Sequence, residues 1–195
     1  MEQKEIEYIY SLKKYILTML IVFIFSMIIG LVVSAKNPGL SETYLGNFED
    51  SFSWIKTLNP LLIMFIIFLN NAIKSLFALV LGIGFGIVPI LFVAGNGVIL
   101  SILADVVAKQ YSVLFVVAAT LPHGIIEVPM VLISSGIGLR LGHVMYLSLK
   151  GVQNDVRSEL KSGIRFFMRV IVPLLFVASI VETFVTPLIA FQFMT

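Results

Sequence analysis

The chain has 195 residues, of which 59% are hydrophobic and 12% are charged, and its mean hydropathy of +1.06 lies far above soluble globular values. The net charge of +2 points to no class of partner, and the lack of cysteine excludes disulfides, thiolate metal sites and a cysteine nucleophile. Long uncharged runs without two-residue alternation exclude a membrane β-barrel and predict an all-α polytopic transmembrane bundle. We expect residues 1–195 to form a single transmembrane domain.

Five apolar runs are predicted to cross the membrane as helices, and the first and fourth are long enough to cross a hydrocarbon core of about 30 Å. In chain order, they predict spans at residues 15–35, 58–73, 75–104, 111–139 and 166–193. A tight turn near Lys74 is predicted to separate the second span from the third, and a re-entrant element inside the third or fourth run is the alternative. The polar stretches 36–57 and 139–169 are predicted to be loops. The first of these loops carries Glu42, Glu49, Asp50 and Trp54.

Glycine and proline interrupt the third and fourth runs. In the third run Gly82 and Gly86 form a GxxxG pair, the pattern that lets two helix backbones approach closely. We favour this packing interpretation over a break at residues 89–97 that exposes backbone groups to a cavity. In the fourth run, Pro122 and Pro129 predict a kink or a break.

Basic residues near the span ends predict the orientation, because lysine and arginine are retained on the cytoplasmic side. A cytoplasmic N-terminus places ten of the 13 basic residues inside and makes the C-terminus external. The ten are Lys4, Lys13, Lys14, Lys74, Arg140, Lys150, Arg157, Lys161, Arg165 and Arg169, whereas Lys36, Lys56 and Lys109 fall outside. We therefore predict a multi-pass protein of the cell membrane.

The fourth run contains the block Leu121-Pro122-His123-Gly124-Ile125-Ile126-Glu127-Val128-Pro129. A histidine and a glutamate four residues apart share one face of a helix. An ionisable side chain at membrane depth costs a few kcal/mol or more, so it usually faces a bundle interior, a wet cavity or a partner. The other polar candidates within or near apolar runs are Asn70, Asn71, Asn96 and Glu182. These residues together define the candidate site.

Several chemistries are compatible with this block. A metal site needs three or four ligands, and no third ligand lies next to this pair in the sequence. Glu182 and His143 are the candidates from elsewhere, but His143 is predicted to lie in a loop. We therefore assign no metal or other cofactor. No HExxH or GxSxG motif accompanies His123 and Glu127, and the nearby serines Ser134 and Ser135 lie two to three turns farther along the same helix. An intramembrane hydrolase is therefore a minor alternative, and no enzyme activity is expected. The remaining interpretations are hydrogen bonding that fixes helix register, worth roughly 0.6 to 2 kcal/mol per group, and a path for a proton or ion.

Residues 150–169 alternate basic and acidic side chains. Lys161, Arg165 and Arg169 recur at four-residue spacing on one helical face, which typically meets lipid headgroups or solvent and could dock an acidic cytoplasmic partner. Without a broad basic surface or a platform of interleaved aromatic residues outside the membrane, nucleic acid binding is not expected.

The order of the polar motifs resembles the stage II sporulation protein M family from about Phe65 to Glu182. The motifs are Phe68-Leu69-Asn70-Asn71, Gly82-Ile83-Gly84-Phe85-Gly86, Asn96-Gly97, the block from Leu121 to Pro129, Gly138-Leu139-Arg140-Leu141-Gly142 and Ala178-Ser179-Ile180-Val181-Glu182. The resemblance implies a multi-span membrane protein of bacteria and archaea. In endospore formers the family member looks like a scaffold that recruits cell-wall hydrolases and has no chemistry of its own.

The expected function is therefore a membrane scaffold or assembly factor with a protein partner at the membrane. We expect it to be homodimeric through the glycine-rich helices, with His123, Glu127, Arg140 and Glu182 in an intramembrane polar network. The alternative is a transporter or channel subunit in which Asn71, Asn96, Glu127 and Glu182 line a path for an ion or small polar solute.

Overall fold

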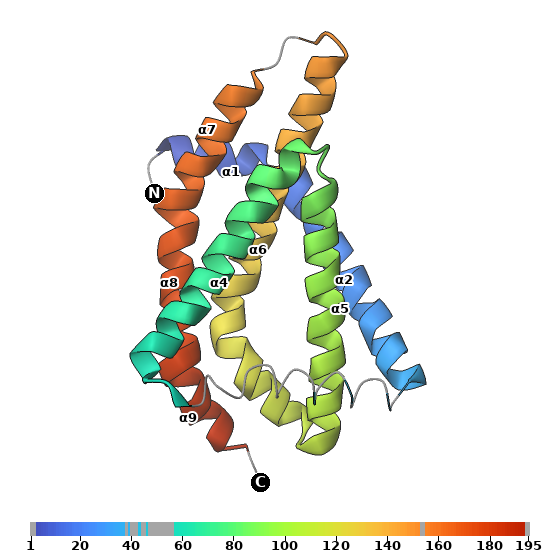
Figure 1. Cartoon of the computed structure of the whole chain (residues 1–195), viewed down its shortest axis with the longest axis vertical. Helices are drawn as coiled ribbons and strands as arrows, with labels where there is room; N and C mark the ends of the chain where they lie inside the picture. Colours follow the sequence, from blue (N-terminus) through green and yellow to red (C-terminus); the bar gives the residue numbers. More distant parts are fainter. Residues whose placement is uncertain are drawn as a thin grey trace.

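The computed structural model describes residues 3–37, 39, 43, 46, 57–152 and 155–193, and over this part of the chain the secondary structure is helical, without strands. Within these residues five helices are long and apolar enough to cross a membrane, which confirms the predicted all-α polytopic bundle. They span Lys13–Lys36, Pro60–Ile83, Ile87–Gln110, Val113–Leu149 and Val156–Phe191. In Figure 1 they run in alternating directions along the long axis, so the N- and C-termini lie at opposite ends.

The first span is preceded by a short helix that lies across one end of the bundle. This helix, α1 (Gln3–Ser11), leads into α2 (Lys13–Lys36), and α2 packs along α5 (Ile87–Gln110) (Figure 1). The contact is close because Gly97 has no side chain: a Cβ there would lie 2.9 Å from the carbonyl oxygen of Phe23. The predicted loop after α2, with Glu42, Glu49, Asp50, Trp54 and Lys56, lies outside the described residues, as does the side chain of Lys4.

The predicted turn at Lys74 is wrong. Helix α4 (Pro60–Val80) continues through Lys74 and ends in the short 3-10 turn η2 (Leu81–Ile83). Lysine is a good helix former and no glycine or proline follows it closely, so nothing in the local sequence stops the helix there. The turn instead forms at Gly84-Phe85-Gly86, where Gly86 has φ 75° and Phe85 has φ 59°. Helix α5 then runs unbroken past Pro89 and Gly97, so the predicted alternative of a break at residues 89–97 is also wrong.

The predicted loop at 139–169 is wrong as well, because most of it is a helical hairpin. Helix α6 (Val113–Leu149) continues ten residues past Leu139, and α7 (Val156–Phe166) begins after a short connection. Gly151, at φ 80°, follows the end of α6 in the left-handed conformation that commonly terminates helices. Asp155 caps α7 by accepting a hydrogen bond of 3.0 Å from the Ser158 amide. The hairpin extends beyond the other helices at one end of the molecule (Figure 1).

Prolines shape the two long spans without breaking them. Pro122 and Pro129 lie inside α6, which stays helical and bends in its lower half (Figure 1), so the predicted kink is present and the break is not. The last span is a rod of five segments: α7, the π-helical turn η3 (Phe167–Ile171), α8 (Val172–Ile180), the π-helical turn η4 (Val181–Val185) and α9 (Thr186–Phe191). Each π turn directly precedes a proline at the start of the next helix, and the widened turn relieves the clash of the ring with the preceding carbonyl.

Glycines on α6 let the η2 turn and α4 pack against it at backbone distance. A Cβ on Gly82 would overlap the backbone of Gly138, and one on Gly142 would overlap that of Phe85 and Gly86. The predicted packing role of Gly82 and Gly86 is therefore realised inside one chain. Helix α6 is the central element, with neighbours on several sides.

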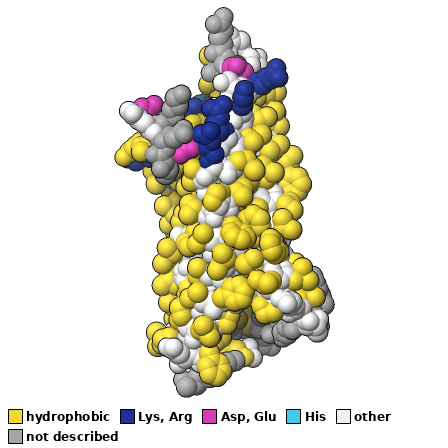
Figure 2. Space-filling model, turned by 90° about the vertical axis from the view of Figure 1, so that its left-hand side faces the viewer, with side chains coloured by type: hydrophobic (Ala, Val, Ile, Leu, Met, Phe, Trp, Pro, Cys, Tyr) yellow, Lys and Arg dark blue, Asp and Glu magenta, His cyan; other side chains and the backbone are white. Residues whose placement is uncertain are grey.

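The inside and outside of the bundle are both apolar. Leu12, Leu79, Ile137, Phe167 and Ile171 are at most 2% exposed and form the core around α6. Many other large apolar side chains remain exposed, including Ile21, Phe25, Phe77, Leu91 and Leu188. Figure 2 shows hydrophobic side chains covering most of one face below an end that carries the charged residues. This outer surface suits the hydrocarbon core of a bilayer.

Candidate functional site

Three of the predicted polar residues meet between two helices at membrane depth. His123 and Glu127 on α6 and Glu182 on η4 each offer a ligand-type atom, and these three atoms lie within 4.8 Å of one another. Each of the three residues is partly buried. We call this group the His/Glu cluster. Glu127 lies about 20 Å along α6 from Arg140, at 1.5 Å per residue, so the cluster is far from the charged end.

Two local features of the backbone place these side chains. His123 and Glu127 are four residues apart on a continuous helix, so they share a face. Glu182 lies in the widened turn η4, and Thr186 follows it by four residues. The Thr186 hydroxyl lies 3.3 Å from Nδ1 of His123 and holds the imidazole ring. π turns of this kind occur frequently at functional sites.

The cluster is not internally satisfied. Oε2 of Glu182 and the hydroxyl of Thr183 are buried and have no hydrogen-bond partner within the described part of the chain. The carboxyl groups of Glu127 and Glu182 are close enough to act electrostatically on each other, and the Lys74 ammonium on α4 also acts on Glu127. An orphaned carboxylate oxygen at this depth is costly. The cluster therefore has unused capacity to hold a proton, a cation or a polar group.

The predicted asparagines do not hydrogen-bond to the cluster. Asn70 is exposed and donates its amide to Asn71 Oδ1 at 3.3 Å. Asn96 is exposed on α5 and donates to the Phe92 carbonyl, one turn back, at 2.7 Å. These bonds are local and satisfy amide groups on single helices.

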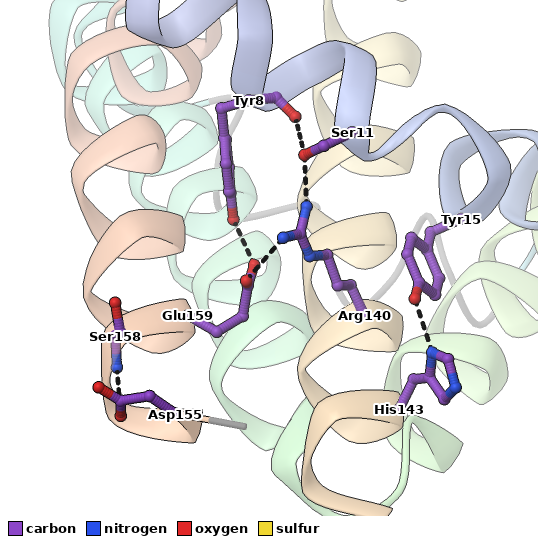
Figure 3. Close-up of polar contacts among 8 residues, drawn as sticks. All are labelled: Tyr8, Ser11, Tyr15, Arg140, His143, Asp155, Ser158 and Glu159. Carbon is purple, nitrogen blue, oxygen red and sulfur yellow. Dashed lines mark hydrogen bonds and ion pairs between the residues drawn. The ribbon is translucent and has the colours of Figure 1, made fainter. Parts of the chain in front are cut away.

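Arg140 belongs to a different site, at the charged end of the bundle. Its guanidinium forms an ion pair of 2.9 Å with Glu159 on α7 and also donates a hydrogen bond to Ser11 on α1. Tyr8 donates its hydroxyl hydrogen to the other oxygen of Glu159 at 3.0 Å, and its ring lies 5.4 Å from the guanidinium carbon (Figure 3). We call Tyr8, Ser11, Arg140 and Glu159 the latch, because they join α1, α6 and α7.

The ion pair of the latch is largely shielded from solvent. The side chains of Arg140 and Glu159 are only 22% and 11% exposed. Burial, reinforced by the adjacent Glu159 carboxylate, raises the pKa of the Tyr8 phenol well above its usual value, so Tyr8 remains a hydrogen-bond donor. A further ion pair of 3.7 Å joins Arg169 to Glu5 on α1. The helical hairpin is thereby fixed to the end of the bundle.

His143 lies on α6, next to α2, so the prediction that it lies in a loop is wrong. Its Nδ1 is 2.7 Å from the Tyr15 hydroxyl (Figure 3). The two residues line an open groove of about 730 Å³ whose lining also includes Lys14, Phe85 and Tyr146. None of the lining residues belongs to the His/Glu cluster, so His143 and His123 lie in two separate sites.

Some of these contacts have a signal in the sequence. On α7, Glu159 shares a face with Gly163 and Phe166, both buried, and a carboxylate on a buried face predicts a cationic partner. At the opposite end of the bundle, fully buried Ser34 donates to Asp105 at 2.6 Å, and Asp105 pairs with Lys109 at 2.5 Å. The spacing of Asp105 and Lys109 predicts their pairing, but nothing in the sequence points to Ser34.

The fold and the distribution of polar groups define a multi-pass helical membrane protein with an ionisable cluster at membrane depth. Residues 19–187 match the family described as Stage II sporulation protein M, and the chain belongs to that family. The match covers most of the chain and confirms the resemblance seen in the polar motifs. Comparisons with curated proteins and with solved structures found no match.

Proposed function

We propose that this protein is a membrane scaffold or assembly factor that docks a protein partner on its helical hairpin, with no catalytic step of its own. The observation that carries the proposal is the rigid attachment of the hairpin to the transmembrane bundle. The latch joins α1, α6 and α7 through one partly buried ion pair and two further hydrogen bonds. A rigid projection on an otherwise lipid-facing protein is suited to binding another molecule.

The outer face of α7 has the chemistry of a docking surface. Arg157, Lys161 and Arg165 are exposed at four-residue spacing, and a groove of about 590 Å³ runs beside them. In Figure 2 the dark blue lysine and arginine side chains gather at this end. Such a face attracts an acidic segment of a partner protein. The interior Glu159 of the latch takes no part in this surface, because it points toward Arg140.

The orientation belongs to the same proposal. Lys13, Lys14, Arg140 and the basic residues of α7 lie at one end of the bundle, whereas Lys36 and Lys109 lie at the other. Because basic residues are retained on the cytoplasmic side, we place the hairpin and the N-terminus in the cytoplasm and the C-terminus outside. A homodimer would use a lipid-facing surface such as the exposed Ile21 and Phe25 face of α2, because the glycines of η2 and α6 are already used in packing within the chain.

Charge reversal on α7 tests the proposal. Affinity capture of the tagged protein from native membranes in mild detergent should recover a defined set of partners, and Lys161→Glu with Arg165→Glu should reduce their yield at least tenfold. Lys36→Glu, at the other end of the bundle, is the matched control and should leave the yield unchanged. Recovery of the same proteins at the same yield with the wild type, the α7 charge-reversal variant and Lys36→Glu would contradict docking on α7.

A second candidate function is supported by the His/Glu cluster. Two carboxyl groups and an imidazole at membrane depth are typical of proton or ion pathways. A hydrolase is less well supported, since Ser134 and Ser135 are fully buried and Ser134 donates to the Ser75 carbonyl at 2.7 Å. In a transporter or channel subunit, Glu127 would be the coupling group and its charge would be required for solute movement.

A further inference from the structure

We propose that His123, Glu127 and Glu182 bind one divalent transition-metal cation between α6 and η4, with Zn²⁺ as the representative ion. The geometry that points to this site is the convergence of one imidazole and two carboxylates, from two separate helices, within 4.8 Å. Only His123 and Glu127 are close to each other along the sequence. Glu182 becomes the third ligand because the last span packs antiparallel to α6.

The donor set selects the class of ion. Imidazole nitrogen favours zinc and the neighbouring first-row metals, whereas sites built only from oxygen favour magnesium or calcium. Three protein ligands with a fourth position open is a common arrangement for zinc. Tetrahedral ligands about 2.1 Å from zinc lie about 3.4 Å apart, so small rotations of the two flexible glutamate side chains bring the three atoms to the required spacing.

The unsatisfied atoms also favour a cation. Oε2 of Glu182 is buried without a hydrogen-bond partner in the described part of the chain. Two carboxylates facing each other repel, and Lys74 on α4 supplies a single positive charge that acts on Glu127. A bound dication would balance the charges of the two carboxylates and occupy the free oxygen. This compensation is needed most at membrane depth, where water is scarce.

A surrounding group already orients the histidine. Thr186 lies 3.3 Å from Nδ1 of His123, and a hydrogen bond to one ring nitrogen leaves the other available as a ligand. Partners of this kind fix the ring orientation and typically contribute 10- to 100-fold to metal affinity. The inference does not depend on the scaffold proposal, because the cluster and the α7 surface lie at different depths and share no residue.

The experiment uses the full chain, carrying a tag without histidine, purified in detergent, stripped with a chelator and titrated with Zn²⁺. Elemental analysis of the washed protein should show one Zn²⁺ per chain for the wild type. His123→Gln and Glu182→Gln should each weaken binding at least tenfold, and Thr186→Val about tenfold. Because the chain has two histidines and no cysteine, His143→Gln is the matched control and should bind like the wild type.

A second readout separates loss of a ligand from loss of the fold. Zn²⁺ should raise the thermal unfolding midpoint of the wild type and of His143→Gln but not that of Glu182→Gln, whose helical circular dichroism without metal should equal that of the wild type. Failure of the wild type to bind Zn²⁺ saturably would overturn the proposal. Equal binding by the wild type and His123→Gln would also overturn it.

Discussion

Replacing Gly138 with valine is expected to destabilise the protein by about 3 kcal/mol. A Cβ at Gly138 would overlap the carbonyl oxygen of Ala78 and lie 3.2 Å from Cα of Leu79. These are backbone atoms, so no side chain can rotate away, and α4 must separate from α6. The loss should appear as a lower midpoint in reversible unfolding by SDS in mixed micelles, followed by helical circular dichroism.

Gly95→Val is the matched control for this substitution. Gly95 also lies within a transmembrane helix, but a Cβ there would meet nothing within 4 Å. Valine and glycine have similar helix propensities to within about 0.5 kcal/mol, so stability should change little. Equal unfolding midpoints for Gly138→Val and Gly95→Val would show that α4 and α6 do not cross at backbone distance.

The second large effect is expected at the latch. Arg140→Gln should lower the free energy of unfolding by about 2 to 4 kcal/mol, because it leaves the Glu159 carboxylate shielded and without its cationic partner. The same change should free the α6–α7 hairpin from α1. Faster amide hydrogen exchange in α7, with unchanged exchange in α5, would report that release.

Two further variants isolate the ion pair. Lys109→Gln breaks the Asp105 pair, in which the lysine side chain is 57% exposed, and should cost no more than about 1 kcal/mol. Arg140→Gln combined with Glu159→Gln removes both charges and should recover part of the loss, since no uncompensated charge remains. An Arg140→Gln chain no less stable than Lys109→Gln would contradict the shielded latch.

The sequence predicts the spans well where composition decides them and poorly where a helix end depends on a turn. Hydropathy places all five spans, because a run of apolar residues is needed to face lipid. It misplaces the second turn by about ten residues, because Lys74 looks like an interruption. A single lysine on the surface of a helix does not stop the helix, whereas the positive φ of Phe85 and Gly86 does. The charged residues of the hairpin obscure its helical pattern, so the sequence predicts a loop there.

The candidate site was only partly predictable for a similar reason. The His123 and Glu127 pair follows from four-residue spacing, which is a local property of a helix. Glu182 lies next to them because of how the last span packs on α6. Arg140 lies far from them because α6 is long and Arg140 is near its other end. Tyr8 and Ser11 are far from Arg140 in sequence, so their contacts depend on where α1 lies across the bundle.

We propose that this protein works by holding partners and not by moving solutes. The most direct test reconstitutes wild type and Glu127→Gln into liposomes and measures ion flux and internal pH, with Zn²⁺, K⁺, Na⁺ and H⁺ gradients and a known channel as the positive control. The scaffold account predicts no flux above protein-free liposomes for either chain. Flux through the wild type that Glu127→Gln abolishes would contradict it and would make the His/Glu cluster part of a transport path.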